Sequence, residues 1–132
     1  MAQNLVTRFY EELWNARKLE IAGEILQPDV TFRSSIGTQH QGVAEVCDYV
    51  TEVTTALEDY TCLIKRCICN DDEASALVEF KGKHIGEFLN YPPSGNTIAW
   101  FGAAFFFFHD NKISDIWVLS DLHELHKQLS SQ

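Results

Sequence analysis

The main change in the spacing of apolar residues along the chain falls near Tyr60, and this change constrains the fold more than any other feature. Before Tyr60, apolar residues recur at helical spacing over residues 4–16 and again over residues 43–57. After Tyr60, apolar and polar residues alternate in runs typical of strands, separated by turn residues. Helices followed by an antiparallel meander predict an α+β domain in which the helices pack on one face of the sheet.

Turn residues and prolines set the expected boundaries of the other elements. A short helix over residues 19–26 should end before Pro28, because proline cannot continue a helix. A short strand around Val30 and Phe32 should follow, and the polar composition of residues 34–42 predicts a loop. The remaining predicted elements are four strands and a closing helix, over residues 60–68, 74–84, 97–109, 113–120 and 122–129.

Size and charge limit the classes of partner. The chain has 132 residues and no linker-like stretch, so we expect one domain over residues 1–132. Its net charge of −9 repels phosphate backbones and anionic lipid headgroups, so we expect no nucleic acid and no membrane as partners. The charged, amphipathic first 14 residues lack a signal-peptide pattern, and the apolar run 99–108 is too short to cross a bilayer. A cytoplasmic location is expected.

The sequence offers no convincing metal site. His123 and His126 lie three residues apart on the expected closing helix, but no third ligand is placed near them. The cysteines form no C-x-x-C pair, and reduced thiols packed as small hydrophobic groups are expected instead of zinc ligands. These cysteines are Cys47, Cys62, Cys67 and Cys69.

Four segments together carry a family resemblance. The run FYEELWNAR at residues 9–17 and the run PDVTF at residues 28–32 are two of them. The most specific is residues 82–95, in which a histidine, a glycine and a phenylalanine precede a Pro-Pro-Ser-Gly turn. The last is DNKI at residues 110–113, followed by a tryptophan and then an aspartate. In this order, the segments resemble those of the SnoaL-like polyketide cyclases, a branch of the nuclear transport factor 2-like superfamily.

The resemblance implies both an architecture and a chemistry. It implies a cone: a curved, mostly antiparallel sheet with N-terminal helices covering its concave face, usually paired into a dimer through the outer face of the sheet. It also implies intramolecular aldol ring closure of polyketide esters without a metal or an organic cofactor. In this chemistry an aspartate at the end of the last strand acts as acid and base, and Asp121 stands at that position.

The role of Asp121 depends on the direction of its side chain. Strand alternation places Trp117 and Asp121 on one face, so both would enter the cavity if Trp117 does. A carboxylate among aromatic rings loses hydration, and its pKa rises toward the range useful for proton transfer. Alternatively, Asp121 is the N-cap of the helix that begins at Leu122. Spacing alone favours the cap, whereas the resemblance favours the pocket.

Other residues are candidates for the cavity. His84, near its expected mouth, could hydrogen-bond a ligand carbonyl or assist Asp121 in proton transfer, or could only shape the adjoining loop. Arg33 stands where relatives often carry a histidine or an aspartate, which alters the polar end of the pocket. Four aromatic residues could line the cavity and bind substrate, although large aromatics are more often plain core: Tyr10, Phe88, Trp100 and Trp117.

The four consecutive phenylalanines at residues 105–108 bear on assembly. In a strand they alternate, so one pair should enter the cavity and the other should point outward. An outward apolar row on an exposed sheet needs a cover, and a homodimer formed sheet to sheet is the simplest one.

Two functions fit these observations. The first is a cofactor-free cyclase or isomerase that acts on a small hydrophobic carbonyl compound, with Asp121 and His84 as catalytic residues. The second is a binding protein of the same fold without enzymatic activity, in which Asp121 only caps a helix. A carboxylate buried beside an empty cavity would favour the enzyme, and a carboxylate turned outward onto the closing helix would favour the binding protein.

Overall fold

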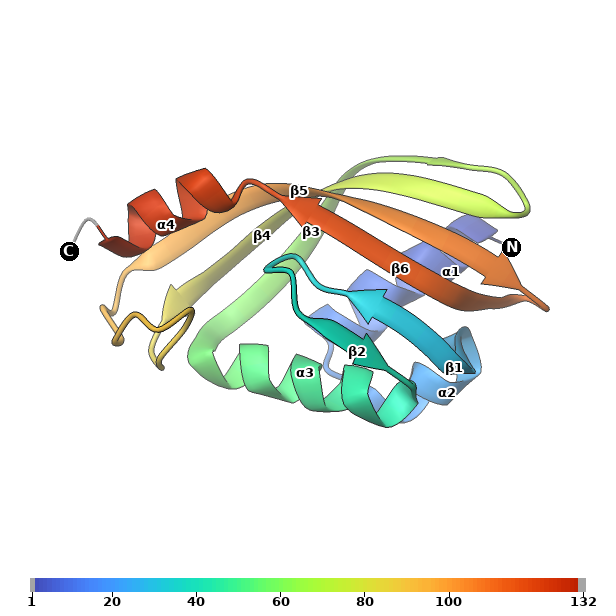
Figure 1. The fold of residues 1–132 in the computed structure, drawn as a ribbon, viewed down its shortest axis with the longest axis horizontal. Helices are drawn as coiled ribbons and strands as arrows, with labels where there is room; N and C mark the ends of the chain where they lie inside the picture. Colours follow the sequence, from blue (N-terminus) through green and yellow to red (C-terminus); the bar gives the residue numbers. More distant parts are fainter. Residues whose placement is uncertain (1, 131–132) are drawn as a thin grey trace.

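The computed structural model describes residues 2–130, which form one curved six-stranded sheet partly wrapped around helices (Figure 1). The strand order is β2-β1-β6-β5-β4-β3. Strands β1 and β6 are parallel, and every other neighbouring pair is antiparallel. The strands are β1 Leu26–Arg33, β2 Gln39–Gln41, β3 Leu57–Cys69, β4 Glu73–His84, β5 Thr97–His109 and β6 Lys112–Ser120. The α+β class and the curved sheet are confirmed.

Helical segments precede the long strands, as the change in periodicity predicted. The N-terminal helix α1 Ala2–Arg8 continues without a break into η1 Phe9–Asn15, a π-helix. Next come η2 Leu19–Ile21, a 3₁₀ turn, and the short α2 Ala22–Ile25. Helix α3 Val43–Ala56 contributes an apolar face to the interior, and α4 Leu122–Ser130 closes the chain against β5. None of the helices within residues 2–130 combines the length and apolarity needed to cross a membrane.

Two local predictions need correction. The segment predicted as a polar loop contains β2, which pairs antiparallel with β1, for example Thr31 with Gln41. The helix before Pro28 ends at Ile25, and Pro28 lies inside β1 instead of after a helix. The strand tolerates this proline because the β1–β6 register is irregular between Leu26 and Thr31, where Pro28 has no β6 partner.

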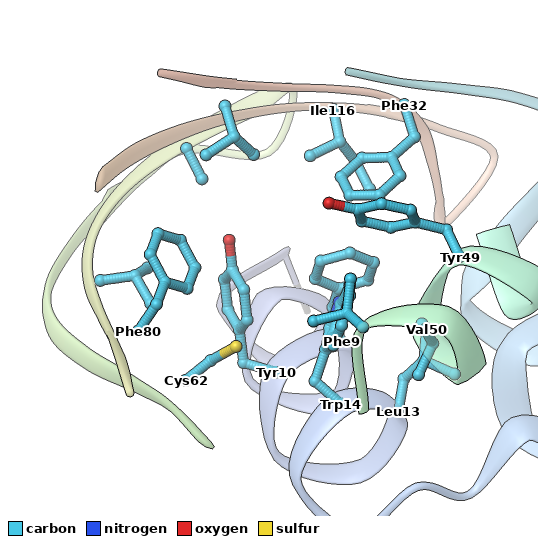
Figure 2. Close-up of a cluster of buried hydrophobic side chains, with 14 of the residues drawn as sticks. Phe9, Tyr10, Leu13, Trp14, Phe32, Tyr49, Val50, Cys62, Phe80 and Ile116 are labelled. Carbon is cyan, nitrogen blue, oxygen red and sulfur yellow. The ribbon is translucent and has the colours of Figure 1, made fainter. Parts of the chain in front are cut away.

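The two faces of the sheet differ sharply in environment. In β5, inward residues such as Trp100 and Phe106 are buried, whereas Phe105 and Phe107 remain 40% and 44% exposed on the outer face. The inner aromatic side chains meet η1 and α3, and Figure 2 shows rings from both helices converging on those of the sheet. Phe9 makes edge-to-face contacts with Phe32 at 5.9 Å and with Phe106 at 5.6 Å between ring centroids. The concave face therefore encloses an aromatic interior.

Candidate functional site

The aromatic interior contains a cavity in which the space between atoms is about 360 Å³, part of it open to solvent. Side chains fill most of this interior, so a ligand larger than a few atoms requires lining side chains to move. The residues that line the cavity come from η1, α3, the turn after β1, the loop after β4 and five strands. The lining residues are Phe9, Tyr10, Trp14, Phe32, Ser35, Tyr49, Val53, Tyr60, Cys62, Phe80, Phe88, Trp100 and Val118.

The π-helix supplies one wall of this cavity. The N–H of Ala16 donates to the carbonyl of Glu11, five residues earlier, at 3.0 Å, which widens the helical turn. The side chain of Asn15 then fixes the helix end to β3, because its Nδ2 donates to the Cys62 carbonyl at 2.9 Å and its Oδ1 accepts from the Cys62 N–H at 2.8 Å. This two-point contact holds Tyr10 and Trp14 against the sheet. π-Turns inside helices occur often at functional sites.

Two polar groups in the cavity wall lack a hydrogen-bond partner. The hydroxyl of Tyr10 and the indole N–H of Trp100 are buried, and among the described residues neither has an acceptor. An unsatisfied buried polar group costs about 1–3 kcal/mol. Figure 2 shows the Tyr10 hydroxyl aimed into the open space between Phe80 and Phe32. Both groups are therefore able to donate to an acceptor atom of a ligand.

The titratable groups that line the cavity are held in their neutral forms. Burial raises the pKa of Tyr10 and of Tyr60 well above the ordinary value, and raises that of Tyr49 to about 12. Burial likewise raises the pKa of the Cys62 thiol. The lining contains neither a carboxylate nor a basic side chain. The cavity thus offers neutral hydrogen-bond donors in apolar surroundings.

His84 is fully buried at the end of β4, on the inward side that also carries Phe80. Its Nδ1 lies 3.1 Å from the Ser94 hydroxyl, and its backbone N–H donates to the Asn96 carbonyl at 2.8 Å. These contacts fix the loop after β4. Its Nε2 is buried and lacks a partner among the described residues, so a second hydrogen bond remains available. His84 is not itself among the residues lining the cavity.

Asp121 and Trp117 do not face the cavity. In β6 the inward residues are Ile116 and Val118, so Trp117 lies on the outer face and is 44% exposed. The alternation was predicted correctly, but its phase was assigned by assuming that Trp117 pointed inward. Asp121 is exposed, and its Oδ1 accepts a hydrogen bond from the Glu124 N–H at 3.1 Å. This contact is that of an N-cap for α4, the alternative that spacing alone had favoured.

Arg33 also lies outside the cavity. Its guanidinium sits over the Trp117 ring, 4.9 Å from the ring centroid, and donates to the Val118 carbonyl. Because Arg33 and Trp117 are register partners in the β1–β6 pair, both occupy the outer face. By contrast, Tyr10, Phe88 and Trp100 line the cavity where they were expected, and their contact with a ligand stays a prediction.

Sequence reasoning missed the part played by Tyr49. The helix predicted over residues 43–57 is present and buries Tyr49, but Tyr49 was not among the residues predicted for the site. Its hydroxyl points into the same space as that of Tyr10 (Figure 2). The available signal was a tyrosine in a row of valines, since a buried phenol needs a polar partner that valine does not.

A curved sheet, a helical layer on its concave face and an aromatic cavity between them define a cone-shaped α+β protein. The sequence profile of the SnoaL-like polyketide cyclases matches residues 4–129. The chain therefore belongs to the SnoaL-like polyketide cyclase family. No curated protein sequence matches it.

Solved structures with low sequence identity share the fold. TsrD from Streptomyces laurentii is 21% identical, with a TM-score of 0.88 over 99% of this chain and 96% of that one. A SnoaL-like polyketide cyclase from Agrobacterium tumefaciens is 16% identical, with a TM-score of 0.77 over 92% of each chain. AclR from Streptomyces galilaeus, named as a candidate hydroxylase, is 20% identical, with a TM-score of 0.75 over 92% of this chain and 90% of that one. These likenesses show the shared fold, and a shared fold does not by itself fix the chemistry.

Proposed function

We propose that the cavity binds a small, neutral, hydrophobic compound of the polyketide-like class that carries a carbonyl oxygen. The observation that carries this proposal is the pair of buried, unpartnered donors, the Tyr10 hydroxyl and the Trp100 indole N–H. A carbonyl oxygen has two lone pairs and could accept from both donors. The aromatic lining suits the rest of such a molecule, and the lack of charged lining residues disfavours an ionic ligand.

The enzymatic form of the proposal is a cofactor-free cyclase or isomerase acting on that compound. Membership of the SnoaL-like polyketide cyclase family supports it. Neutral donors in an apolar site stabilise the negative charge that develops on a carbonyl oxygen when a proton leaves the adjacent carbon. His84 is the group proposed to move the proton, because its buried Nε2 is unpartnered. Asp121, exposed and capping α4, is not included among the groups that reach the ligand.

A non-catalytic binding protein is the second candidate. It is favoured by the outward position of Asp121 and by the absence of a carboxylate from the cavity lining. In this form the same donors orient the ligand, and the neighbouring His84 only holds the loop through Ser94.

The binding proposal is tested with 2-acetonaphthone, an aromatic methyl ketone. We expect calorimetry to show binding, and infrared spectroscopy to show a carbonyl stretch lower than that of the ketone in hexane, because hydrogen bonds weaken the C=O bond. Tyr10→Phe should return the stretch part of the way toward the hexane value. Tyr91→Phe is the matched control, since the Tyr91 hydroxyl contacts His126 instead of the cavity. Absence of binding, or an unchanged stretch in Tyr10→Phe, would contradict the proposal.

The same ketone separates the enzyme from the binding protein. In D₂O, an acid/base site should accelerate exchange of the methyl protons next to the carbonyl, as followed by proton NMR. His84→Gln should remove that acceleration while the ketone still binds. Exchange at the rate of ketone alone, with binding intact, would support the binding protein and exclude the enzyme.

We also propose a homodimer formed through the outer face of the sheet. The outer face carries a cluster of exposed apolar side chains on four adjacent strands. Several are cross-strand partners, such as Phe105 with Trp117. The cluster consists of Leu63, Leu77, Phe101, Phe105, Phe107, Trp117 and Leu119. An apolar surface of this kind on a water-facing sheet is typical of a protein–protein contact.

A further inference from the structure

A ligand larger than a few atoms enters the cavity only if part of the lining moves, and one part is attached more loosely than the rest. Most lining residues belong to helices or strands, which are held by regular hydrogen bonds. Phe88 is an exception, because it lies in the loop between β4 and β5, at residues 85–96 (Figure 1). Its side chain is buried beside the Trp100 ring, with ring centroids 6.2 Å apart. The loop therefore closes one side of the cavity with the Phe88 ring.

The tip of this loop is a tight turn whose backbone is bonded to itself. The Phe88 N–H donates to the Tyr91 carbonyl at 3.1 Å, and the Tyr91 N–H donates to the Phe88 carbonyl at 2.9 Å. Within the part of the chain that the structure describes, residues 87–94 make no other hydrogen bond between backbone groups. The backbone of the tip is therefore not tied to the rest of the protein.

Both ends of the loop, by contrast, are anchored through the backbone. The N–H groups of Ile85 and Gly86 donate to the Ala56 carbonyl, each at 3.0 Å, and the Gly95 N–H donates to the His84 carbonyl at 2.8 Å. A glycine stands at each end. A Cβ on Gly86 would lie 3.1 Å from Ala56 Cα, and Gly95 has a φ of +77°, in the region that favours glycine. Two anchored glycines thus flank an unanchored tip, an arrangement suited to a pair of hinges.

The closed turn is strained at one residue. Leu89 and Asn90 have φ values of 52° and 68°, in the left-handed region. Asparagine tolerates this region, whereas leucine is sterically disfavoured there because its Cβ comes close to a carbonyl oxygen. An opening that changes the Leu89 backbone would release this strain.

Two side-chain contacts hold the tip in its closed position. The Tyr91 hydroxyl lies 3.1 Å from His126 Nδ1 on α4, and the two rings pack with centroids 5.7 Å apart. The Ser94 hydroxyl lies 3.1 Å from His84 Nδ1. The Tyr91–His126 contact is exposed, so water can replace it when the loop moves.

We propose that residues 86–95 form a lid that opens at Gly86 and Gly95 to admit the ligand, and that the Tyr91–His126 contact is its latch. The proposal rests on the proposed function, since it concerns how the proposed ligand enters. Opening withdraws the Phe88 ring from Trp100 and exposes the Trp100 indole N–H, one of the two donors for the ligand carbonyl.

Exchange of the Trp100 indole proton with D₂O tests the opening without a ligand. This N–H is buried and has no acceptor among the described residues, so exchange requires water to reach it. We expect it to exchange faster than the buried backbone N–H groups of β5, because local opening requires less free energy than unfolding. NMR follows both kinds of proton in the same sample.

A variant of the latch links this exchange to the lid. His126→Phe removes the hydrogen bond and keeps a ring beside Tyr91. It should accelerate Trp100 exchange about fivefold, the effect expected from the loss of one hydrogen bond. His123→Phe is the matched control, because His123 is also exposed on α4, and it should leave the exchange rate unchanged.

Stopped-flow mixing with 2-acetonaphthone, followed by tryptophan fluorescence, tests entry. The latch holds the lid closed in both the empty and the occupied protein. His126→Phe should therefore raise the association and dissociation rate constants by a similar factor, about fivefold, and leave the affinity measured by calorimetry unchanged. His123→Phe should alter neither rate.

The outcomes separate the lid from the proposed function. Trp100 exchange at the rate of the β5 backbone, or at the same rate in His126→Phe and the wild type, would overturn the lid. Ketone binding with rate constants unchanged in His126→Phe would also overturn it and leave the proposed function standing. Failure of the ketone to bind would overturn the proposed function, while Trp100 exchange would still decide whether the lid opens.

Discussion

At the scale of single residues, Asp121 fits two expectations at once: the position of the aspartate in the family resemblance, and the preference for aspartate at the N-cap of a helix. Its position at the end of the last strand matches the resemblance, and its carboxylate accepts from the Glu124 N–H. Two substitutions separate these roles. Asp121→Ala should lower the free energy of unfolding by about 1 kcal/mol, because the cap is lost, whereas Asp121→Asn should change it little, because asparagine caps equally well.

Urea denaturation followed by tryptophan fluorescence measures both values for Asp121. The same two variants should retain the binding of 2-acetonaphthone, since the carboxylate is exposed. Loss of methyl-proton exchange in Asp121→Asn, without loss of stability, would contradict this. It would mean that the carboxylate reaches the ligand in a second side-chain conformation, besides the one that caps α4.

At the scale of elements, the sequence located most helices and strands but not their finer geometry. The strand over residues 97–109 was predicted with the bounds it has. The π-helix at residues 9–15 could not be predicted, because its apolar residues also fit an α-helical stripe and the tie from Asn15 to Cys62 is a contact across 47 residues. Strand β2 escaped prediction because its three residues are polar and are specified only by pairing with β1.

Gly102, in β5, gives a prediction about strand packing next to the cavity. A Cβ at this position would lie 2.7 Å from Phe80 Cε2 and 3.0 Å from the Leu119 carbonyl oxygen. The backbone atom cannot retreat alone, so Gly102→Ala should displace the Phe80 ring, a cavity wall, and cost about 1–3 kcal/mol of stability.

Gly23→Ala is the matched control for Gly102. It lies in α2 with no heavy atom within 4 Å of the added Cβ, and should be neutral or stabilising by up to about 1 kcal/mol. Urea denaturation compares the pair, and 2-acetonaphthone affinity should fall only in Gly102→Ala. Equal stability of the two variants would mean that the sheet accommodates the extra methyl group.

At the scale of the whole molecule, the cone and its aromatic interior followed from periodicity and resemblance, whereas the direction of each polar group did not. Alternation assigns the residues of β6 to two faces, but it does not show which face is inside. Placing Trp117 in the cavity also placed Asp121 there, because the two lie on the same face. The lack of partners for the Tyr10 hydroxyl and the Trp100 indole N–H can be recognised only in the packed structure, because a sequence does not show which polar groups lack partners.

Burial of the cavity phenols predicts a loss of stability at high pH. The folded-state pKa of Tyr49 is raised from 10.0 to about 12, so ionisation favours the unfolded chain. The stabilisation is complete below pH 10 and is lost as pH rises toward 12, by roughly 2–3 kcal/mol for this residue. Tyr49→Phe should lessen the fall in unfolding free energy between pH 9 and 11.5, measured by urea denaturation. An identical slope in both proteins would mean that Tyr49 ionises as freely when folded.

The outer face of the sheet predicts a dimer that a single charge should break. Phe105 sits at its centre, opposite Trp117 on one side and Ser75 on the other, and is 40% exposed. Phe105→Lys should leave the fold intact, since the side chain does not enter the core, and should abolish association by placing two buried, like charges in the interface.

Sedimentation equilibrium should give a dimer for the wild type and a monomer for Phe105→Lys. Lys127→Phe, on the exposed side of α4, is the reverse control and should remain dimeric. A monomeric wild type would mean that the apolar outer face is left open to solvent or to a different partner.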